Sequence, residues 1–278
     1  MKVCVFGASG YVGASVYKQL EKRPDVDVVG TYLTKPVMLD GLYKLDVNEP
    51  ESFSRFYKNE NPDVVIWSVM SGPDEYELME QGFMHLLSHL TPDTKLVYMS
   101  SDLVFSDGNG PYEESDPIST LPEDHLYHNY VNAKVKAERF IDHERSNYVI
   151  LRTGPVYGEN IFGKLDAYTD KLSYRLRSGR EVAFRDDLIR TFINVEELAD
   201  IVEKMALNDV TGIYHVGHEQ PMSFYAFMQQ EANRLGYNAD RVMKDSEYEA
   251  PDEGIPKNTS LHTEKIKNVC HRVSCEMS

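Results

Sequence analysis

The chain has 278 residues, of which 41% are hydrophobic and 27% charged, and its formal net charge is -16. A chain of this length buries roughly three quarters of its unfolded surface on folding, enough for one α/β core and a smaller lobe. The acidic charge argues against binding to nucleic acid or to an anionic membrane surface. No apolar run approaches the roughly 20 residues of a membrane helix, and no signal-peptide pattern precedes the first strand, so we expect a cytoplasmic protein.

Residues 2–13, KVCVFGASGYVG, predict a buried strand, a glycine turn and the start of a helix. Gly7, Gly10 and Gly13 follow the apolar run at intervals of three. Glycine permits positive φ and lets a ligand approach the backbone, and the N-terminus of the following helix attracts an anionic pyrophosphate. This order predicts a dinucleotide-binding turn, although a structural turn without a ligand has the same pattern.

Strands and helices alternate through the first half of the chain. We expect strands at 26–32, 45–47, 64–67, 95–100 and 148–152, and helices at 50–59, 74–90 and 130–145. Such alternation predicts an α/β fold with a Rossmann-type doubly wound parallel sheet, whose ligands bind at the carboxyl ends of the strands.

The end of the strand at 26–32 is where NAD and NADP sites usually differ. An NAD site places an acidic residue there to hold the ribose 2′-hydroxyl. Here the positions are taken by residues such as Tyr32 and Lys35, with no carboxylate, so NADP is favoured and NAD stays open. Asp46 is interpreted either as an acceptor for the adenine amino group or as a turn residue.

A second informative feature is the pair Tyr130 and Lys134, which lie at i and i+4 on one face of the expected helix. An ammonium beside the phenol, together with an oxidised nicotinamide, would lower the tyrosine pKa and let it exchange a proton near neutral pH. Ser101, at the end of the preceding strand, could hold the same substrate oxygen. The Y-x-x-x-K spacing also occurs by chance in helices, but here it follows the glycine turn and a Ser-Ser-Asp strand end, which favours carbonyl reduction.

The second half of the chain alternates less strictly. We expect helices at 163–178, 195–207 and 223–235, short strands at 182–184 and 213–216, and a polar, turn-rich end. The prediction is an NADP-binding domain over 1–160 that also receives about 190–217, interleaved with a small substrate-binding lobe formed mainly by 161–278.

Cysteine and histidine usage argues against metal or disulfide chemistry. Cys4, Cys270 and Cys275 are odd in number and contain no C-x-x-C pair, so we expect reduced, structural cysteines and no zinc site. His85 and His89 lie one helical turn apart without a third ligand in the sequence, and we interpret them as surface residues.

Taken together, the sequence resembles the extended short-chain dehydrogenase/reductase superfamily and, within it, the dTDP-4-dehydrorhamnose reductase-like branch. The segments that carry the resemblance read VFGASGYVG, PDVVIWS, YMSSDLVFSDGNGPYEESDP, YVNAKVKAE, LRTGPVYGEN, VEELADIV, GIYHVG and PKNTSLHTEKI. The resemblance implies that Ser101, Tyr130 and Lys134 form the catalytic triad.

A larger set of residues is expected around the ligands. The resemblance implies cofactor contacts at Gly7, Gly10, Tyr11, Val12, Asp46, Val47, Ser68, Val69 and Met70. We also expect cofactor contacts at Ser9, Gly13, Tyr32, Lys35, Tyr130, Lys134 and Pro155. Substrate contacts are expected at Asp102, Phe105, Tyr157, Arg185 and Arg190. The two arginines are included because a guanidinium suits a diphosphate, although ordinary surface positions would explain them equally.

Some positions depart from the family pattern. The family more often has threonine at Ser101, an aromatic residue at Leu103, small residues at 67–70 and tryptophan at Pro155. These changes leave the redox chemistry intact and the identity of the sugar open. Two hypotheses follow. The first is an enzyme: an NADP(H)-dependent reductase of a keto-sugar nucleotide, or a related epimerase or dehydratase. The second is a non-catalytic NADP-binding regulatory subunit like that of methionine adenosyltransferase. A homodimer is compatible with either.

Overall fold

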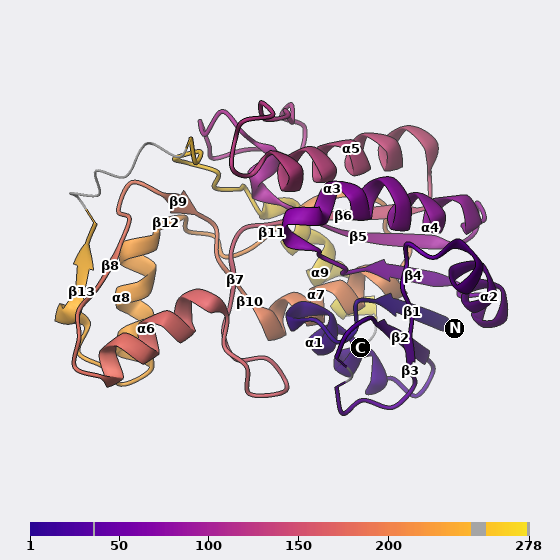
Figure 1. Cartoon of the computed structure of the whole chain (residues 1–278), viewed down its shortest axis with the longest axis horizontal. Coiled ribbons are helices and arrows are strands. Elements are labelled where there is room, and N and C mark those ends of the chain that lie inside the picture. Colours follow the sequence, from indigo (N-terminus) through magenta and orange to yellow (C-terminus); the bar gives the residue numbers. More distant parts are fainter. Residues whose placement is uncertain (36, 246–253, 277–278) are drawn as a thin grey trace.

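The structure is a computed structural model that describes residues 1–35, 37–245 and 254–276. Its centre is a seven-stranded sheet in which all neighbouring strands are parallel (Figure 1). In sheet order the strands are β11 (Gly212–Val216), β6 (Tyr148–Thr153), β5 (Lys95–Ser101), β4 (Val64–Trp67), β1 (Lys2–Phe6), β2 (Asp27–Tyr32) and β3 (Leu42–Lys44). The predicted Rossmann-type doubly wound sheet is confirmed.

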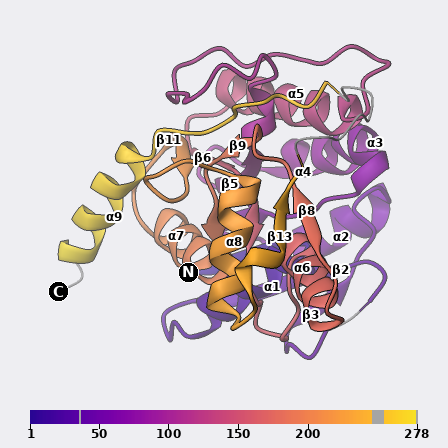
Figure 2. The same cartoon turned by 90° about the vertical axis from the view of Figure 1, so that its left-hand side faces the viewer.

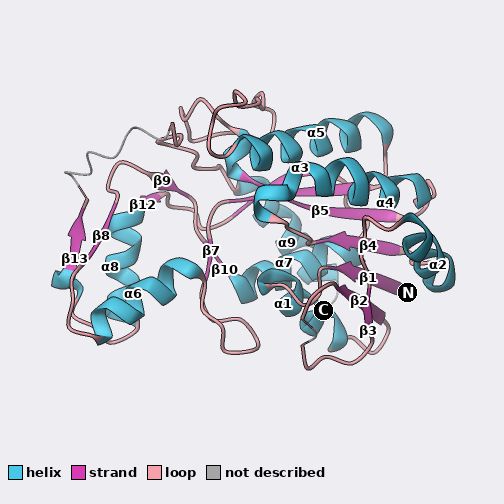
Figure 3. Ribbon diagram, in the orientation of Figure 1, coloured by secondary structure: helices cyan, strands magenta, loops and turns pink. Residues whose placement is uncertain are grey.

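Helices cover both faces of this sheet (Figure 3). One face carries α2 (Pro50–Glu60), α3 (Glu75–Leu78), α4 (Met84–His89) and α5 (His128–Glu144), and the other carries α1 (Tyr11–Glu21), α7 (Val195–Leu207) and α9 (Glu264–Glu276). The strands are apolar on both sides because both sides are buried. On the first face Phe6 stacks on Phe53 at 5.6 Å and contacts Trp67 at the same centroid distance. Within the described ranges, no helix combines the length and apolar character needed to cross a bilayer.

A smaller lobe lies beyond the carboxyl ends of the strands (Figures 1 and 2). It contains α6 (Ala167–Arg177), α8 (Phe224–Arg234), and the paired strands β8 (Val182–Phe184) with β13 (Val242–Lys244) and β9 (Ile189–Arg190) with β12 (Met222–Ser223). Its core includes Phe192, which stacks on Phe227 at 3.8 Å. A third pair, β7 (Val156–Tyr157) and β10 (Ile193–Asn194), connects the lobe to the sheet. After β10, α7 and β11 bring the chain back to the main sheet.

The last part of the chain does not belong to the small lobe. The expected polar, turn-rich end contains α9, whose Ile266 joins the core beneath the sheet, and Lys265 Nζ lies 4.5 Å from the Tyr214 ring centroid on β11. Ile266, Val269 and Cys270 lie three to four residues apart, a helical pattern that the sequence analysis did not use. The side chain of Cys275 lies outside the described part of the structure, while Cys4 is a buried free thiol.

Two further elements differ from the prediction. The third strand lies at β3 rather than at 45–47, because Asp46 forms a turn in which its carboxylate accepts from the backbone N–H of Asn48 at 3.0 Å. The helix expected over 74–90 is divided into α3, a π-helical turn at Met79–Phe83 and α4. Gly82 in that turn passes so close to the chain that an added Cβ would lie 2.6 Å from Val47 Cγ2.

A buried polar network lies between β6, β11 and α5. Arg152 Nη2 donates to Glu138 Oε2 at 2.7 Å, and Arg152 Nη1 lies 3.4 Å from Nε2 of His215, which is fully buried. Burial and the neighbouring Arg152 guanidinium lower the pKa of His215 to about 3. The imidazole is therefore neutral in the folded protein near neutral pH.

This histidine predicts acid-sensitive folding. Its unfolded pKa is about 6.5, so between pH 6.5 and 3 the unfolded chain binds a proton that the folded chain does not. The stabilisation is complete above pH 6.5 and decreases as the pH falls, by about 2 kcal/mol at pH 5. Guanidinium unfolding at pH 7.5 and pH 5 is expected to show this loss in the wild type and to lack it in His215→Gln. The exposed His262 beside Glu113 is the control, and equal pH sensitivity in His215→Gln and His262→Gln would contradict the assignment.

Candidate active site

The carboxyl ends of the central strands open into a cavity of about 610 Å³. Its lining comes from the turns after β1, β2, β3 and β4, from the end of β5, from the start of α1 and from α5. Predicted residues that line it are Gly7, Ser9, Gly10, Tyr11, Val12, Tyr32, Asp46, Val47, Ser68, Val69, Met70, Tyr130 and Lys134. Residues separated by more than a hundred positions in the sequence thus share one groove at the strand ends.

The glycine turn brings the backbone of β1 against that of β4. Gly7 has φ of +83°, and a Cβ there would lie 2.8 Å from Ser68 O. Gly13 is not part of the lining, since it lets α1 pack on the turn: a Cβ at this position would lie 2.2 Å from Gly7 O. The N-terminus of α1 at Gly10 has no side-chain cap and no acidic residue in its first turn. Its free N–H groups and dipole therefore suit an anion such as a pyrophosphate.

The end of β2 forms one end of the cavity. Tyr32 lines it, and Thr31 accepts from Gly7 N–H at 3.2 Å, which fixes the turn. Lys35 is exposed and does not line the cavity. Asp46 lines it while also forming the turn with Asn48. Both interpretations of Asp46 are therefore compatible with its position.

Tyr130 and Lys134 from α5 form the other end of the cavity. Lys134 Nζ lies 5.6 Å from the Tyr130 ring centroid and donates to Met99 O at 3.3 Å. The Ser101 hydroxyl is within hydrogen-bonding reach of the Tyr130 phenol. Burial raises the pKa of Tyr130, whereas the Lys134 ammonium and the Ser101 hydroxyl oppose this change. The three residues predicted as a triad are brought together beside the groove.

Glu75, which the sequence analysis did not single out, contacts this group. Its Oε1 lies 3.0 Å from Lys134 Nζ, and both side chains are buried. Burial alone would lower the pKa of Lys134, but neighbouring Tyr98, Glu75 and Tyr130 hold it well above its usual value. The lysine is therefore a cation at every pH at which the protein would work. Only the fold could reveal this contact, because Glu75 and Lys134 lie on different helices.

Two of the expected substrate residues are enclosed by the protein itself. Asp102 accepts from Ser101 Oγ at 3.2 Å and from the Thr259 hydroxyl, and its Oδ2 lies 3.6 Å from Arg190 Nε. Arg190 is 3% exposed and donates to the backbone carbonyls of Pro256 and Lys257. Its guanidinium is therefore engaged by the returning C-terminal segment rather than offered to a diphosphate.

The other expected substrate residues also differ in placement. Phe105 is fully buried and stacks on Tyr112 at 4.0 Å, so it packs the loop rather than lining the groove. Tyr157 lines a separate hollow beside His218. Arg185 lies in the small lobe and pairs with Asp187 at 2.6 Å. Pro155 follows β6 but does not contribute to the groove lining.

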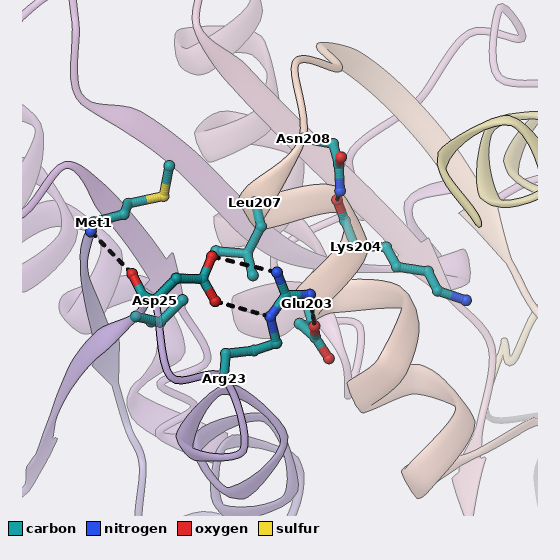
Figure 4. A pocket seen from close by; sticks show the side chains of 8 residues that line it. Met1, Arg23, Asp25, Glu203, Lys204, Leu207 and Asn208 are labelled. Carbon is teal, nitrogen blue, oxygen red and sulfur yellow. Dashed lines mark hydrogen bonds and ion pairs between the residues drawn. The ribbon is translucent and has the colours of Figure 1, made fainter. Parts of the chain in front are cut away.

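A second, smaller hollow of about 70 Å³ lies at the opposite, amino end of the strands (Figure 4). Arg23 closes it by donating from Nε to Asp25 Oδ1 at 3.1 Å and from Nη1 to Glu203 Oε1 at 3.3 Å. The amino group of Met1 donates to Asp25 O at 3.1 Å. These contacts tie the end of α1 to α7, so this hollow is explained by helix packing.

Further groove residues could have been found from strand geometry. Thr31, Leu33, Thr34, Asn48, Ser71, Thr153 and Leu198 line the cavity in addition to the predicted residues. Several of them directly adjoin predicted positions at strand ends, which was an available signal.

His85 and His89 pack beside Phe53, and His89 lies 5.3 Å from that ring, so they are partly buried rather than free on the surface. Among the described residues, no group of three or more His, Cys, Asp or Glu side chains is arranged to hold a metal ion.

The doubly wound sheet and its glycine turn define a Rossmann-type fold, which the chain shares with solved nucleotide-sugar enzymes. Residues 1–277 match the family model described as RmlD substrate binding domain, and the chain belongs to that family. It is also 26% identical to methionine adenosyltransferase 2 subunit beta from Danio rerio over 240 residues, covering 81% of this chain and 71% of that protein.

Solved structures share the fold over nearly the whole chain. A hypothetical dTDP-4-dehydrorhamnose reductase from Sulfolobus tokodaii superposes with a TM-score of 0.81 at 20% identity, covering 96% of this chain and 94% of that one. The dTDP-4-dehydrorhamnose reductase of Bacillus anthracis, solved in complex with NADP, gives 0.75 at 18% identity with 99% and 98% coverage. The dTDP-glucose 4,6-dehydratase of the same organism, solved with NAD, gives 0.78 at 15% identity with 98% and 90% coverage.

Proposed function

We propose that this protein is an NADP(H)-dependent reductase of a keto-sugar nucleotide. The observation that carries the proposal is the placement of Tyr130 and Lys134 in the same cavity as the glycine turn. The cavity suits a dinucleotide because Gly7 and Gly10 bring the backbone to its wall without side chains and the N-terminus of α1 offers uncapped N–H groups. The strand end after β2 carries no carboxylate among residues 31–35, which supports NADP over NAD.

In this proposal a bound NADPH supplies the hydride, and the chain supplies the proton and the geometry. Tyr130 donates its phenolic proton to the carbonyl oxygen as that oxygen gains charge. Ser101 hydrogen bonds to the same oxygen and keeps it near the phenol. The Lys134 ammonium stabilises the phenolate that remains, which is the role of an adjacent cation in acid catalysis.

A second candidate function is that of an NADP-binding regulatory subunit without its own catalysis, which the similarity to methionine adenosyltransferase 2 subunit beta supports. A chain of this fold that binds NADP and acts on a partner enzyme needs the cofactor groove, but it does not need Tyr130 as a proton donor. The enclosed positions of Asp102, Phe105 and Arg190 favour this candidate, because they remove three expected substrate contacts from the surface of the groove.

One experiment separates the two functions. NADPH fluorescence is followed on titration with the protein, and absorbance at the reduced-nicotinamide band is then recorded with a dTDP-4-keto-6-deoxy sugar. Oxidation of NADPH that depends on the sugar supports the reductase. Tight NADPH binding without turnover on any keto-sugar nucleotide supports the regulatory subunit, and absence of NADPH binding would contradict both.

A further inference from the structure

The Glu75 carboxylate bridges two parts of the candidate site. Its Oε1 lies 3.0 Å from Lys134 Nζ, and its Oε2 accepts from the backbone N–H of Ser71 at 2.7 Å. Ser71 belongs to the loop at 68–71, which follows β4 and lines the cavity. The same side chain thus contacts the cofactor-side loop and the lysine of the expected acid–base pair.

Burial makes the pairing of Glu75 with Lys134 strong. The two side chains are 4% and 5% exposed, so solvent does not screen their charges. An ammonium has three donors; within the described residues, Glu75 and Met99 O take two of them. One donor remains for a ribose hydroxyl or for the phenolate of Tyr130. Glu75 therefore positions the ammonium without using all of its donors.

The Glu75 carboxylate also opposes the lowering of the Tyr130 pKa by Lys134. Charged and titratable groups around Tyr130 and Lys134 come from each neighbouring element: Tyr98 from β5, Glu75 from α3, and Asp102 after β5. Glu138, one turn further along α5, is held by Arg152. Lys134 and Ser101 favour the phenolate, whereas Glu75 and Asp102 oppose it. Glu75 thereby widens the pH range over which Tyr130 carries the proton needed for reduction.

We propose that Glu75 is a positioning residue of this site, which holds the Lys134 ammonium beside Tyr130, moderates its charge, and couples both to the loop at 68–71. Because it deepens the proposed function, this proposal rests on that function for its catalytic meaning. Through this contact, a cofactor bound against the loop is coupled to the acid–base pair of Tyr130 and Lys134. Gly72, with φ of +65°, follows the loop and leads through a short helical turn directly to Glu75.

The test compares Glu75→Gln with Glu80→Gln. Glu80, in the π-helical turn that follows α3, pairs with Lys136 of α5, but both side chains are exposed and outside the cavity. Protein labelled with ¹³C at the tyrosine Cζ is titrated by NMR, with and without NADP⁺, and the Tyr130 signal is assigned by its loss in Tyr130→Phe. In Glu75→Gln the Tyr130 titration is expected to move to lower pH, because a negative charge beside the phenol is removed. In Glu80→Gln it is expected not to move.

A second measurement separates positioning from simple support of the fold. The NADPH affinity of Glu75→Gln is expected to stay within about threefold of the wild type, because the third ammonium donor of Lys134 is available to the cofactor in both proteins. A merely structural role predicts weaker binding instead. Because removing one partner of a buried pair can unfold a protein, Glu75→Asp serves as the second variant. It keeps the charge but shortens the reach, and the expected Tyr130 titration lies between those of the wild type and Glu75→Gln.

The outcomes are distinguishable from failure of the proposed function. A Tyr130 titration that is unchanged in both Glu75 variants overturns the positioning role, whatever the turnover. A shifted titration without turnover on any keto sugar supports the role of Glu75 and counts against the reductase. If NADPH does not bind, the titration of the cofactor-free protein still decides whether Glu75 acts on Tyr130.

Discussion

Replacing Tyr130 by phenylalanine is expected to lower kcat for keto-sugar reduction by about 10²- to 10⁴-fold, the usual contribution of a positioned general acid. The aromatic ring that packs 5.6 Å from Lys134 Nζ is retained, and only the hydroxyl is lost. NADPH affinity should therefore change little. The measurement is the initial rate of NADPH oxidation at saturating sugar, together with a fluorescence titration of NADPH.

Tyr76 provides a matched control for this variant. Like Tyr130 it lies beside a lysine of α5, with Lys136 Nζ 5.4 Å from its ring centroid, but it is outside the cavity. Tyr76→Phe is expected to keep wild-type kcat. If Tyr130→Phe retains turnover within about threefold of the wild type, Tyr130 is not the proton donor, since loss of a general acid costs far more.

Local patterns explain why much of the fold could be predicted from the sequence. The strand at 64–67 has four buried residues in succession, and the helix at 195–207 has an asparagine cap, a continuous apolar face and a clear end. Each signal lies within one element and needs no knowledge of its neighbours. The glycine turn was predictable for the same reason: Gly7, Gly10 and Gly13 and the helix that follows them lie in one short segment of the chain.

The parts that could not be predicted depend on contacts between distant segments. Arg190 was expected to meet a diphosphate because of its chemistry, but the backbone at 256–257 folds over it and takes its donors. Glu75 carries no motif of its own, and its meaning comes from Lys134, which lies on another helix. Sequence spacing predicts residues that share a helix face, whereas these pairs are set by how the chain returns to the sheet.

The extent of β3 illustrates a third limit. Leu45 and Val47 are apolar and buried, which favours a strand at 45–47, yet the ladder with β2 ends near Lys44. Leu45 N–H still donates to Tyr32 O at 2.8 Å, and the turn at Asp46 then redirects the chain. Burial alone therefore does not distinguish a strand from the turn that follows it, and boundaries are decided by side-chain hydrogen bonds.

The glycine turn makes a second prediction with a large effect. Gly10 has φ of -74° and ψ of 172°, an extended conformation that valine adopts readily. Its Cβ would lie 3.1 Å from Gly7 O, a tight contact, and the branched side chain would stand at the N-terminus of α1 where a pyrophosphate would bind. Gly10→Val is therefore expected to fold but to lose NADPH affinity by about 100-fold or more, equivalent to roughly 2.7 kcal/mol.

Neighbouring glycines show why Gly10 is the informative position. Valine at Gly13 would place its Cβ 2.2 Å from Gly7 O, so that variant should fail to pack α1 and lose stability rather than affinity alone. Thermal unfolding and NADPH fluorescence together distinguish the two effects. Wild-type affinity in a folded Gly10→Val protein would mean that the dinucleotide does not cross the turn. In that case Tyr130 and Lys134 would have no nicotinamide beside them, and the reductase proposal would lose its basis.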